Sequence, residues 1–207
     1  MRIKICGLTR YEDAKLAHNL GAWALGFIFY EGSKRCITTD AAETVLTQLP
    51  DNARRVGVFV NQTDDAIALA QDLPLQTLQL HGDETPDDCA KARATGLRTI
   101  KALRPQTPDD IDGAKNYMDA VDYILIDTAG AGYGGSGKTA DWSLARRAVD
   151  AGLPVILAGG LKADNILAAA DTNVYALDLA GGVEMAPGIK DHDKMRTLFT
   201  TAKGAAP

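Results

Sequence analysis

A thiol and a carboxylate end two short apolar runs of the sequence. Cys6 closes the run IKIC within KICGLTR, and Asp127 closes the run YILID. A thiolate is a base, and nearby backbone N–H groups or cations favour that form; a carboxylic acid held opposite it can act as a general acid. Together they suit proton movement in an isomerisation that needs no metal or organic cofactor. The competing interpretations are a small buried core cysteine and a solvated acid that caps a local turn.

Two pairs of glycines follow later apolar runs. Gly159 and Gly160 stand in LAGGL, and Gly181 and Gly182 stand in LAGGVE. Backbone N–H groups at such turns, together with the N-terminus of a short helix, commonly bind phosphate. Ordinary turn glycines are the alternative, but two such loops after consecutive runs favour a phosphate site.

A third glycine-rich stretch matches the phosphate-loop pattern G-x-x-x-x-G-K-[ST]. It reads GYGGSGKT, from Gly132 to Thr139. A working phosphate loop leaves a strand directly and begins a helix at the Lys-Thr pair. Here several residues separate the stretch from YILID, and Asp141 is expected to cap a helix that starts later. We therefore expect a lid that closes over a ligand; a nucleotide-binding protein and a surface loop without a role are the alternatives.

Short apolar runs alternate with amphipathic stretches along the chain, and these elements must position the side chains above. The runs are rich in β-branched or aromatic residues, as is typical of parallel strands buried on both faces. Thr9 is expected to cap the first helix, and Asp141 and Asp164 to cap later ones or supply first-turn acids. The expected strands are residues 3–6, 24–29, 55–60, 77–80, 98–103, 123–127, 154–159 and 175–179, and the expected helices are residues 11–20, 39–49, 64–73, 86–95, 108–118, 142–151, 163–170 and 191–202.

About eight strand–helix units in 207 residues predict an α/β fold, a single-domain (β/α)8 TIM barrel over residues 1–207 with a frayed C-terminal tail. An open doubly wound sheet is the alternative. In a barrel, chemistry occurs at the carboxyl ends of the strands. His81 is expected there as a hydrogen-bonded residue that shapes its loop. The residues expected at these ends are Cys6, Arg35, Asn61, His81, Arg104, Asp127, Gly159, Gly160, Asp178, Gly181 and Gly182.

Composition narrows the class of protein. The chain is 46% hydrophobic and 24% charged, as is typical of globular proteins, and its net charge of −5 argues against nucleic acid or an anionic membrane as the main partner. Three widely spaced cysteines do not favour disulfides or a zinc site. The first residues lack the pattern of a signal peptide. We expect a cytoplasmic protein that acts on an anionic small molecule.

Several motifs in combination resemble one enzyme family. KICGLTR, LQLHGDE, the loop from Asp127 to ADW, PVILAGGL and GGVE…PGIKD are similar to phosphoribosylanthranilate isomerases of tryptophan biosynthesis, over about residues 4–194. The resemblance implies an Amadori rearrangement of N-(5-phosphoribosyl)anthranilate without a cofactor. It implies that Asp127 is the general acid that protonates the ribose ring oxygen, and that Cys6 is the general base that removes the C2′ proton.

The resemblance also implies substrate contacts. Arg35 matches an arginine that contacts the anthranilate carboxylate, Asp178 matches an acid near the sugar, and Lys138 lies in the matching lid. It implies a small-molecule phosphosugar-anthranilate substrate. We expect no nucleic acid or membrane partner, and a monomer or homodimer. The implied phosphate-binding residues are Gly159, Gly160, Ala180 and Gly181.

Three segments depart from the family pattern. Ser33-Lys34-Arg35 stands where the family usually has Ser-Pro-Arg, Asp178-Leu-Ala-Gly-Gly stands where it usually has Asp-Val-Ser-Ser-Gly, and YEGS replaces a stretch richer in proline. Backbone N–H groups must therefore supply more of the phosphate binding. The rival sugar-phosphate isomerase of histidine biosynthesis resembles an Asp/Asp pair with Asp in place of Cys6. A barrel that binds phosphosugars without catalysis is a further alternative.

Overall fold

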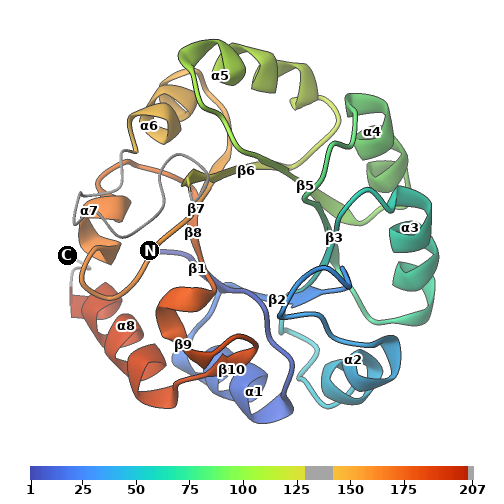
Figure 1. Ribbon diagram of the computed structural model, residues 1–207, viewed down its shortest axis with the longest axis vertical. Helices are drawn as coiled ribbons and strands as arrows, with labels where there is room; N and C mark the ends of the chain where they lie inside the picture. Colours follow the sequence, from blue (N-terminus) through green and yellow to red (C-terminus); the bar gives the residue numbers. More distant parts are fainter. Residues whose placement is uncertain (129–141, 205–207) are drawn as a thin grey trace.

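The computed structural model describes residues 1–128 and 142–204. Its eight main strands form a closed parallel barrel in sequence order, with helices around the outside (Figure 1). The barrel closes because β1 pairs with β8, with Lys4 opposite Asp178. The predicted barrel is therefore confirmed and the open sheet is wrong. The strands are β1 (Ile3–Ile5), β2 (Ala24–Ile28), β3 (Arg55–Phe59), β4 (Thr77–Leu80), β5 (Arg98–Leu103), β6 (Tyr123–Asp127), β7 (Val155–Ala158) and β8 (Ala176–Leu179).

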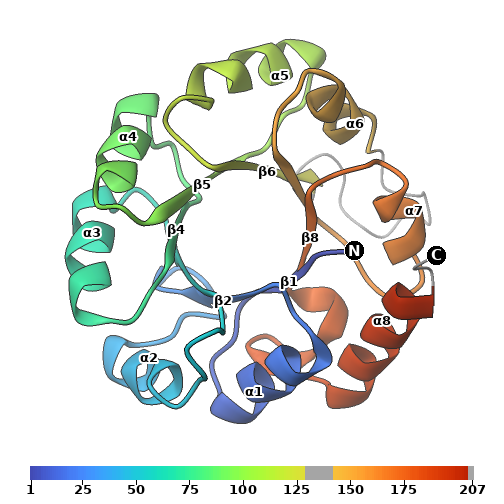
Figure 2. The same ribbon diagram turned by 180° about the vertical axis from the view of Figure 1, so that it is seen from behind.

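The helices form the outer ring, and α8 lies beside α1 where the ring closes (Figure 2). They are α1 (Tyr11–Leu20), α2 (Thr39–Leu46), α3 (Thr63–Asp72), α4 (Pro86–Ala94), α5 (Pro108–Ala114), α6 (Ser143–Asp150), α7 (Ile166–Ala170) and α8 (His192–Gly204). A short 3₁₀ helix, η1 (Lys115–Tyr117), extends α5. No helix in the described ranges is long and apolar enough to cross a membrane.

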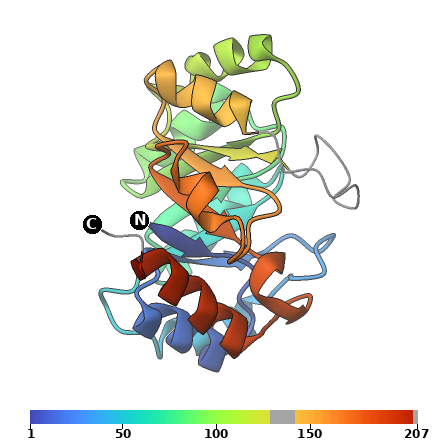
Figure 3. The same ribbon diagram turned by 90° about the vertical axis from the view of Figure 1, so that its left-hand side faces the viewer.

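The sequence analysis missed an antiparallel hairpin between β8 and α8. It consists of β9 (Glu184–Ala186) and β10 (Ile189–Lys190), after the 3₁₀ helix η3 (Gly181–Val183). In side view the hairpin lies at the opposite end of the barrel from the start of β1 (Figure 3). It therefore lies at the end where the strands finish.

Two expected helix caps are wrong. The residue before α1 is Arg10, without a side-chain cap, because the Thr9 hydroxyl instead donates a 2.6 Å hydrogen bond to the Gly188 carbonyl. Asp164 lies before the start of α7 and pairs with Lys162 at 2.8 Å. In both cases a tertiary or local contact takes the oxygen that the sequence pattern assigned to a helix end.

Alternation along the strands divides the buried side chains into two groups. Ile3 and Ile5 of β1 belong to the layer between the barrel and its helices. Cys6, Val58 and Leu125 belong to a separate cluster inside the barrel. Since successive side chains of a strand point to opposite faces, Lys4 also points inward.

Aromatic rings fill the amino end of the barrel. Tyr123, Tyr175 and Trp23 stand at the beginnings of β6, β8 and β2, with ring centroids 4.6–5.7 Å apart. The guanidinium groups of Arg2 and Arg54 lie 4.3 Å and 4.7 Å from the ring centroids of Tyr175 and Trp23, a stabilising cation–π geometry. This end is therefore closed by side chains.

A buried ion pair holds the loop after β4. Lys101 Nζ lies 2.7 Å from Glu84 Oε2, and the two side chains are 1% and 2% exposed. Glu84 also accepts backbone hydrogen bonds from Asn61 and Gly82, at 2.7 Å and 2.9 Å. Burial alone would raise the pKa of Glu84, but these hydrogen bonds, with that from Lys101, lower it below its usual range. The loop that carries His81 is thus fixed by one carboxylate.

We expect Lys101→Met to lower the free energy of unfolding by about 3–5 kcal/mol, because it leaves a buried carboxylate without its counter-charge. Urea denaturation at neutral pH measures this change. The difference from the wild type should shrink as pH falls through the lowered pKa of Glu84, where the carboxylate takes up a proton.

Lys115→Met is the matched control, since its ion pair with Asp112 is about half exposed. It should cause little change. Equal stability of the Lys101→Met protein and the wild type would refute the importance of this pair.

Candidate active site

Cys6 lies just beyond the end of β1, at the carboxyl end of the barrel. Its backbone N–H donates to the Leu179 carbonyl at 2.8 Å, which continues the pairing with β8, and the residue is only 6% exposed. Gly7 has φ +71°, and a Cβ atom there would lie 2.5 Å from Cδ of Arg35. Only glycine suits this turn, which brings the Arg35 side chain over the residue next to the thiol.

Burial governs the protonation of this thiol. The pKa of Cys6 is raised, chiefly because burial disfavours the thiolate; Lys4 and Lys190 act to lower it, and the charge of Asp178 acts to raise it. The cations that the sequence analysis expected near the thiol are present. They reduce the effect of burial without cancelling it, so the protein without ligand favours the neutral thiol.

Asp127 is the last residue of β6 and lies at the same end of the barrel as Cys6. The strand register places it beside Ala158 of β7, which lies beside Asp178 of β8, which lies beside Lys4 of β1. Alternation with Leu125, which is in the interior cluster, points the Asp127 side chain inward. The carboxylate and the thiol therefore approach a common interior region from different strands.

His81 faces the Asp127 carboxylate. Its Nε2 lies 3.6 Å from Asp127 Oδ2, and its Nδ1 lies 2.9 Å from the amide nitrogen of Gln79. An amide nitrogen donates, so in this orientation Nδ1 accepts and the ring proton lies on Nε2, toward Asp127. The expected hydrogen-bonded role of His81 thus includes a partner that sequence reasoning missed, because the two residues lie on different strands.

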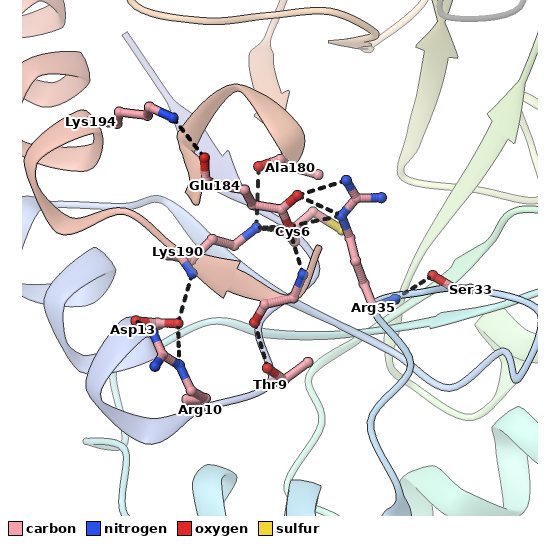
Figure 4. Close-up of polar contacts among 11 residues, drawn as sticks. Cys6, Thr9, Arg10, Asp13, Ser33, Arg35, Ala180, Glu184, Lys190 and Lys194 are labelled. Carbon is pink, nitrogen blue, oxygen red and sulfur yellow. Dashed lines mark hydrogen bonds and ion pairs between the residues drawn. The ribbon is translucent and has the colours of Figure 1, made fainter. Parts of the chain in front are cut away.

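A buried carboxylate joins the loop after β2 to the hairpin. Glu184 accepts hydrogen bonds from Arg35 Nε at 2.8 Å and Arg35 Nη2 at 2.7 Å, and from Lys190 Nζ at 2.8 Å (Figure 4). Burial alone would raise the pKa of Glu184, but Arg35 and Lys190 lower it. Lys190 Nζ also donates to the carbonyls of Cys6 at 2.6 Å and Ala180 at 3.2 Å. One ammonium group thus connects the residue that carries the thiol with the loop after β8.

Asp13 holds the hairpin from the other side. This fully buried carboxylate accepts hydrogen bonds from the side chain of Arg10 at 2.9 Å and the backbone N–H of Lys190 at 3.0 Å, and it lies 2.8 Å from the His192 ring. The contacts of Asp13 therefore fix β10 against α1 and the start of α8. Glu184 and Lys190 belong to the motif GGVE…PGIKD, but nothing in the local sequence indicates that they pair with each other or with Arg35.

The loops after β7 and β8 lie against each other. Gly159 and Gly160 have φ values of +98° and +64°, and a Cβ atom on Gly182 would overlap the carbonyl oxygen of Leu161. Ala180 and Gly181 lead into η3, directly after Asp178 and Leu179 of β8. Successive N–H groups in such turns form concave sites for anions. Asp178 itself is 7% exposed, with Oδ2 on Lys4 Nζ at 2.8 Å.

The segment from Gly132 to Thr139 lies outside the described residues, as does Lys138, so the lid expectation stays a prediction. The helix that follows, α6, begins at Ser143, after the expected position of its cap. Among the residues that the structure describes, no group of three His, Cys, Asp or Glu side chains is arranged to hold a metal ion.

Comparisons with known proteins identify one family. Residues 3–201 match the family model described as N-(5'phosphoribosyl)anthranilate (PRA) isomerase. The N-(5'-phosphoribosyl)anthranilate isomerase of Thermotoga petrophila is 42% identical over 206 residues, which is 99% of each chain.

Two solved structures cover 99% of each chain at 37% identity. One is a phosphoribosyl anthranilate isomerase in complex with reduced 1-(o-carboxyphenylamino)-1-deoxyribulose 5-phosphate, with a TM-score of 0.87. The other, with a TM-score of 0.86, is of monomers generated from the dimeric enzyme of Thermotoga maritima.

We expect Gly182→Ala to weaken the binding of inorganic phosphate about tenfold, or about 1.4 kcal/mol. The new methyl group must push the loop after β8 away from Leu161. Titration calorimetry with phosphate measures the change. Gly113→Ala is the control, because a Cβ atom there meets nothing within 4 Å; equal affinity of Gly182→Ala and the control would refute a phosphate site between these loops.

Proposed function

The chain belongs to the N-(5'-phosphoribosyl)anthranilate isomerase family, and from this membership we propose that Cys6 and Asp127 are its general base and general acid. The protein is an isomerase of tryptophan biosynthesis. It converts N-(5-phosphoribosyl)anthranilate to 1-(2-carboxyphenylamino)-1-deoxyribulose 5-phosphate by an Amadori rearrangement. The observation that supports the residue roles best is the inward placement of a thiol and a carboxylate at the same end of one barrel.

The two proton transfers have distinct locations in this proposal. Asp127 protonates the ribose ring oxygen, the ring opens, and the anthranilate nitrogen becomes a Schiff base. Cys6, as thiolate, removes the C2′ proton, and the resulting enolamine tautomerises to the ketone. The product has the composition of the substrate, because the one proton that Asp127 gives is matched by the one proton that Cys6 takes. The enzyme is reset when Cys6 loses that proton and Asp127 regains one. Nε2 of His81, 3.6 Å from the carboxylate, is placed to stabilise the anionic form of Asp127.

Arg35 is proposed to bind the anthranilate carboxylate. Glu184 occupies Nε and one N–H of Nη2, so Nη1 and the second N–H of Nη2 form the edge available for a ligand. A guanidinium that is fixed along one edge loses less freedom when its other edge binds a carboxylate. The departure Ser33-Lys34-Arg35 therefore need not loosen Arg35, because Glu184 holds it and the Ser33 hydroxyl accepts from its backbone N–H at 3.1 Å.

The sugar phosphate is proposed to bind between the loops after β7 and β8. Gly159, Gly160, Ala180 and Gly181 supply backbone N–H groups there. The adjacent Asp178 faces the sugar. The hydroxyls missing from Asp178-Leu-Ala-Gly-Gly leave this task to the backbone, which the close approach of the two loops supports.

Every residue in this proposal comes from one chain. We propose that the protein acts as a monomer or a homodimer; one solved relative is named as a dimeric enzyme. We also propose the cytoplasm as its location, on the ground of its biosynthetic role. The findings do not support nucleotide binding through residues 132–139 or a histidine-pathway activity.

We expect Cys6→Ala and Asp127→Asn each to lower kcat about 10²–10⁴-fold, the usual effect of removing a positioned acid or base. The assay follows the decay of anthranilate-type fluorescence when the enzyme meets freshly made phosphoribosylanthranilate. Cys89→Ala removes another buried thiol, on α4, and Asp122→Asn removes a carboxylate at the amino end of β6. Both controls should keep normal activity, and a Cys6→Ala protein as active as its control would refute the assignment of the base.

We expect Glu184→Gln to raise KM about tenfold while kcat falls less, because a neutral amide orients the Arg35 guanidinium more weakly than a carboxylate does. Steady-state kinetics on the folded variant separate the two constants. Glu12→Gln is the control, since its contact with Arg10 is exposed at 3.5 Å. An unchanged KM would show that Glu184 does not prepare Arg35 for the substrate.

A further inference from the structure

A lysine side chain lies inside the barrel next to the thiol. Lys4 is fully buried on β1, and its Nζ lies 2.8 Å from Oδ2 of Asp178 on β8. Burial alone would lower the pKa of Lys4, but the negative charge of Asp178, and that of Cys6 when it is a thiolate, raise it. The side chain is therefore an ammonium ion held in a protein interior, where a charge without a role is costly.

Lys4 and Cys6 point into the barrel from the same face of β1, two residues apart. Gly26 of β2 lies across from both of them. A Cβ atom on Gly26 would lie 2.8 Å from Cys6 Sγ and 3.2 Å from Lys4 Cε. The absence of a side chain at Gly26 thus makes room for the thiol and the lysine stem together.

We propose that Lys4 is a positioning residue for the catalytic base: its buried ammonium, held in place by Asp178, is the counter-charge that allows Cys6 to exist as a thiolate. This proposal rests on the assignment of Cys6 as the base. Within a low-dielectric interior, a buried cation near the sulfur acts more strongly than in water and is screened much less by salt. Lys4 acts through Cys6.

Of the charges near Cys6, that of Lys4 contributes most to stabilising the thiolate. Among the charges, Lys4 does most to lower the pKa of the thiol and Asp178 does most to raise it. Lys190 also lowers it, but its ammonium is paired with Glu184 and donates to the Cys6 carbonyl. Arg35 interacts with the thiol as well, and its guanidinium is likewise paired with Glu184.

The second carboxylate oxygen of Asp178 also affects whether Cys6 is a thiol or a thiolate. Its Oδ1 is buried and has no hydrogen-bond partner in the part of the chain that the structure describes. A hydroxyl or N–H donor of a bound ligand would satisfy this atom, since unpaired buried acceptors are costly. Such a donor would also withdraw negative charge from the vicinity of the thiol. Ligand binding would then favour the thiolate only when the base is needed.

The test measures the thiol in the enzyme without substrate. The rate at which iodoacetamide alkylates Cys6, followed by mass spectrometry of its peptide, is measured from about pH 6 to about pH 11; this range extends well above the ordinary thiol pKa because the pKa of Cys6 is raised. For Lys4→Met we expect the midpoint to rise by about one unit, so that alkylation near neutral pH slows about tenfold. Lys115→Met is the control: it also removes a lysine that forms an ion pair, but one that is about half exposed and distant from the thiol in sequence. Its midpoint should equal that of the wild type.

Asp178→Asn supplies the second arm and should lower the midpoint, because it removes the charge that opposes the thiolate and frees Lys4 for the sulfur. A purely structural role for Lys4 would not produce shifts of opposite sign. A folded Lys4→Met protein with the wild-type midpoint would overturn the proposal, as would Asp178→Asn with an unchanged or raised midpoint.

The alkylation test is independent of the isomerase assay. If Cys6→Ala retained full activity while the midpoints moved as expected, the assignment of Cys6 as base would fail and the electrostatic inference would stand. If Cys6→Ala were inactive and the midpoints did not move, only the inference about Lys4 would fail.

Discussion

The ion pair between Lys4 and Asp178 lies across the seam where the first strand meets the last. The same two residues are partners in the backbone register that closes the barrel, so one contact joins fold and site. Cys6 follows two residues after Lys4, and the glycine turn of η3 follows shortly after Asp178. Any slip of register along this seam would move the thiol away from its counter-charge, because a shift of one residue exchanges the two faces of a strand. The closure therefore constrains the catalytic geometry as much as the shape.

The sequence predicts the barrel and the positions of its strands well, and the reason is physical. Strands such as RVGVF and YILID are buried on both faces, so they appear as largely apolar runs. Cys6 and Asp127 could be singled out because polar side chains at the ends of such runs lie at the active end of a barrel. The resemblance to the family added the substrate and the roles of these residues.

The contacts that organise the site were not readable from local pattern. Glu184 meets Arg35 across 149 positions of sequence, and Lys4 meets Asp178 across 174. Nothing in the letters around Glu184 indicates a partner so distant. A lysine in the middle of the apolar run IKI was a signal of a different kind, since a charge there must either be buried with a partner or break the strand. The sequence pattern does not predict the hairpin β9–β10, because its strands are only three and two residues long and show no periodicity.

The aromatic rings at the amino end leave the carboxyl end of the barrel as the end open to ligands. Trp23, Tyr123 and Tyr175 close the amino end. Substrate must therefore bind, and product must leave, through the carboxyl end. Substrate and product then use the same route, so each turnover includes a product-release step before the next substrate can bind. The amino end of the barrel thus contributes to folding stability, and the carboxyl end binds and releases ligands.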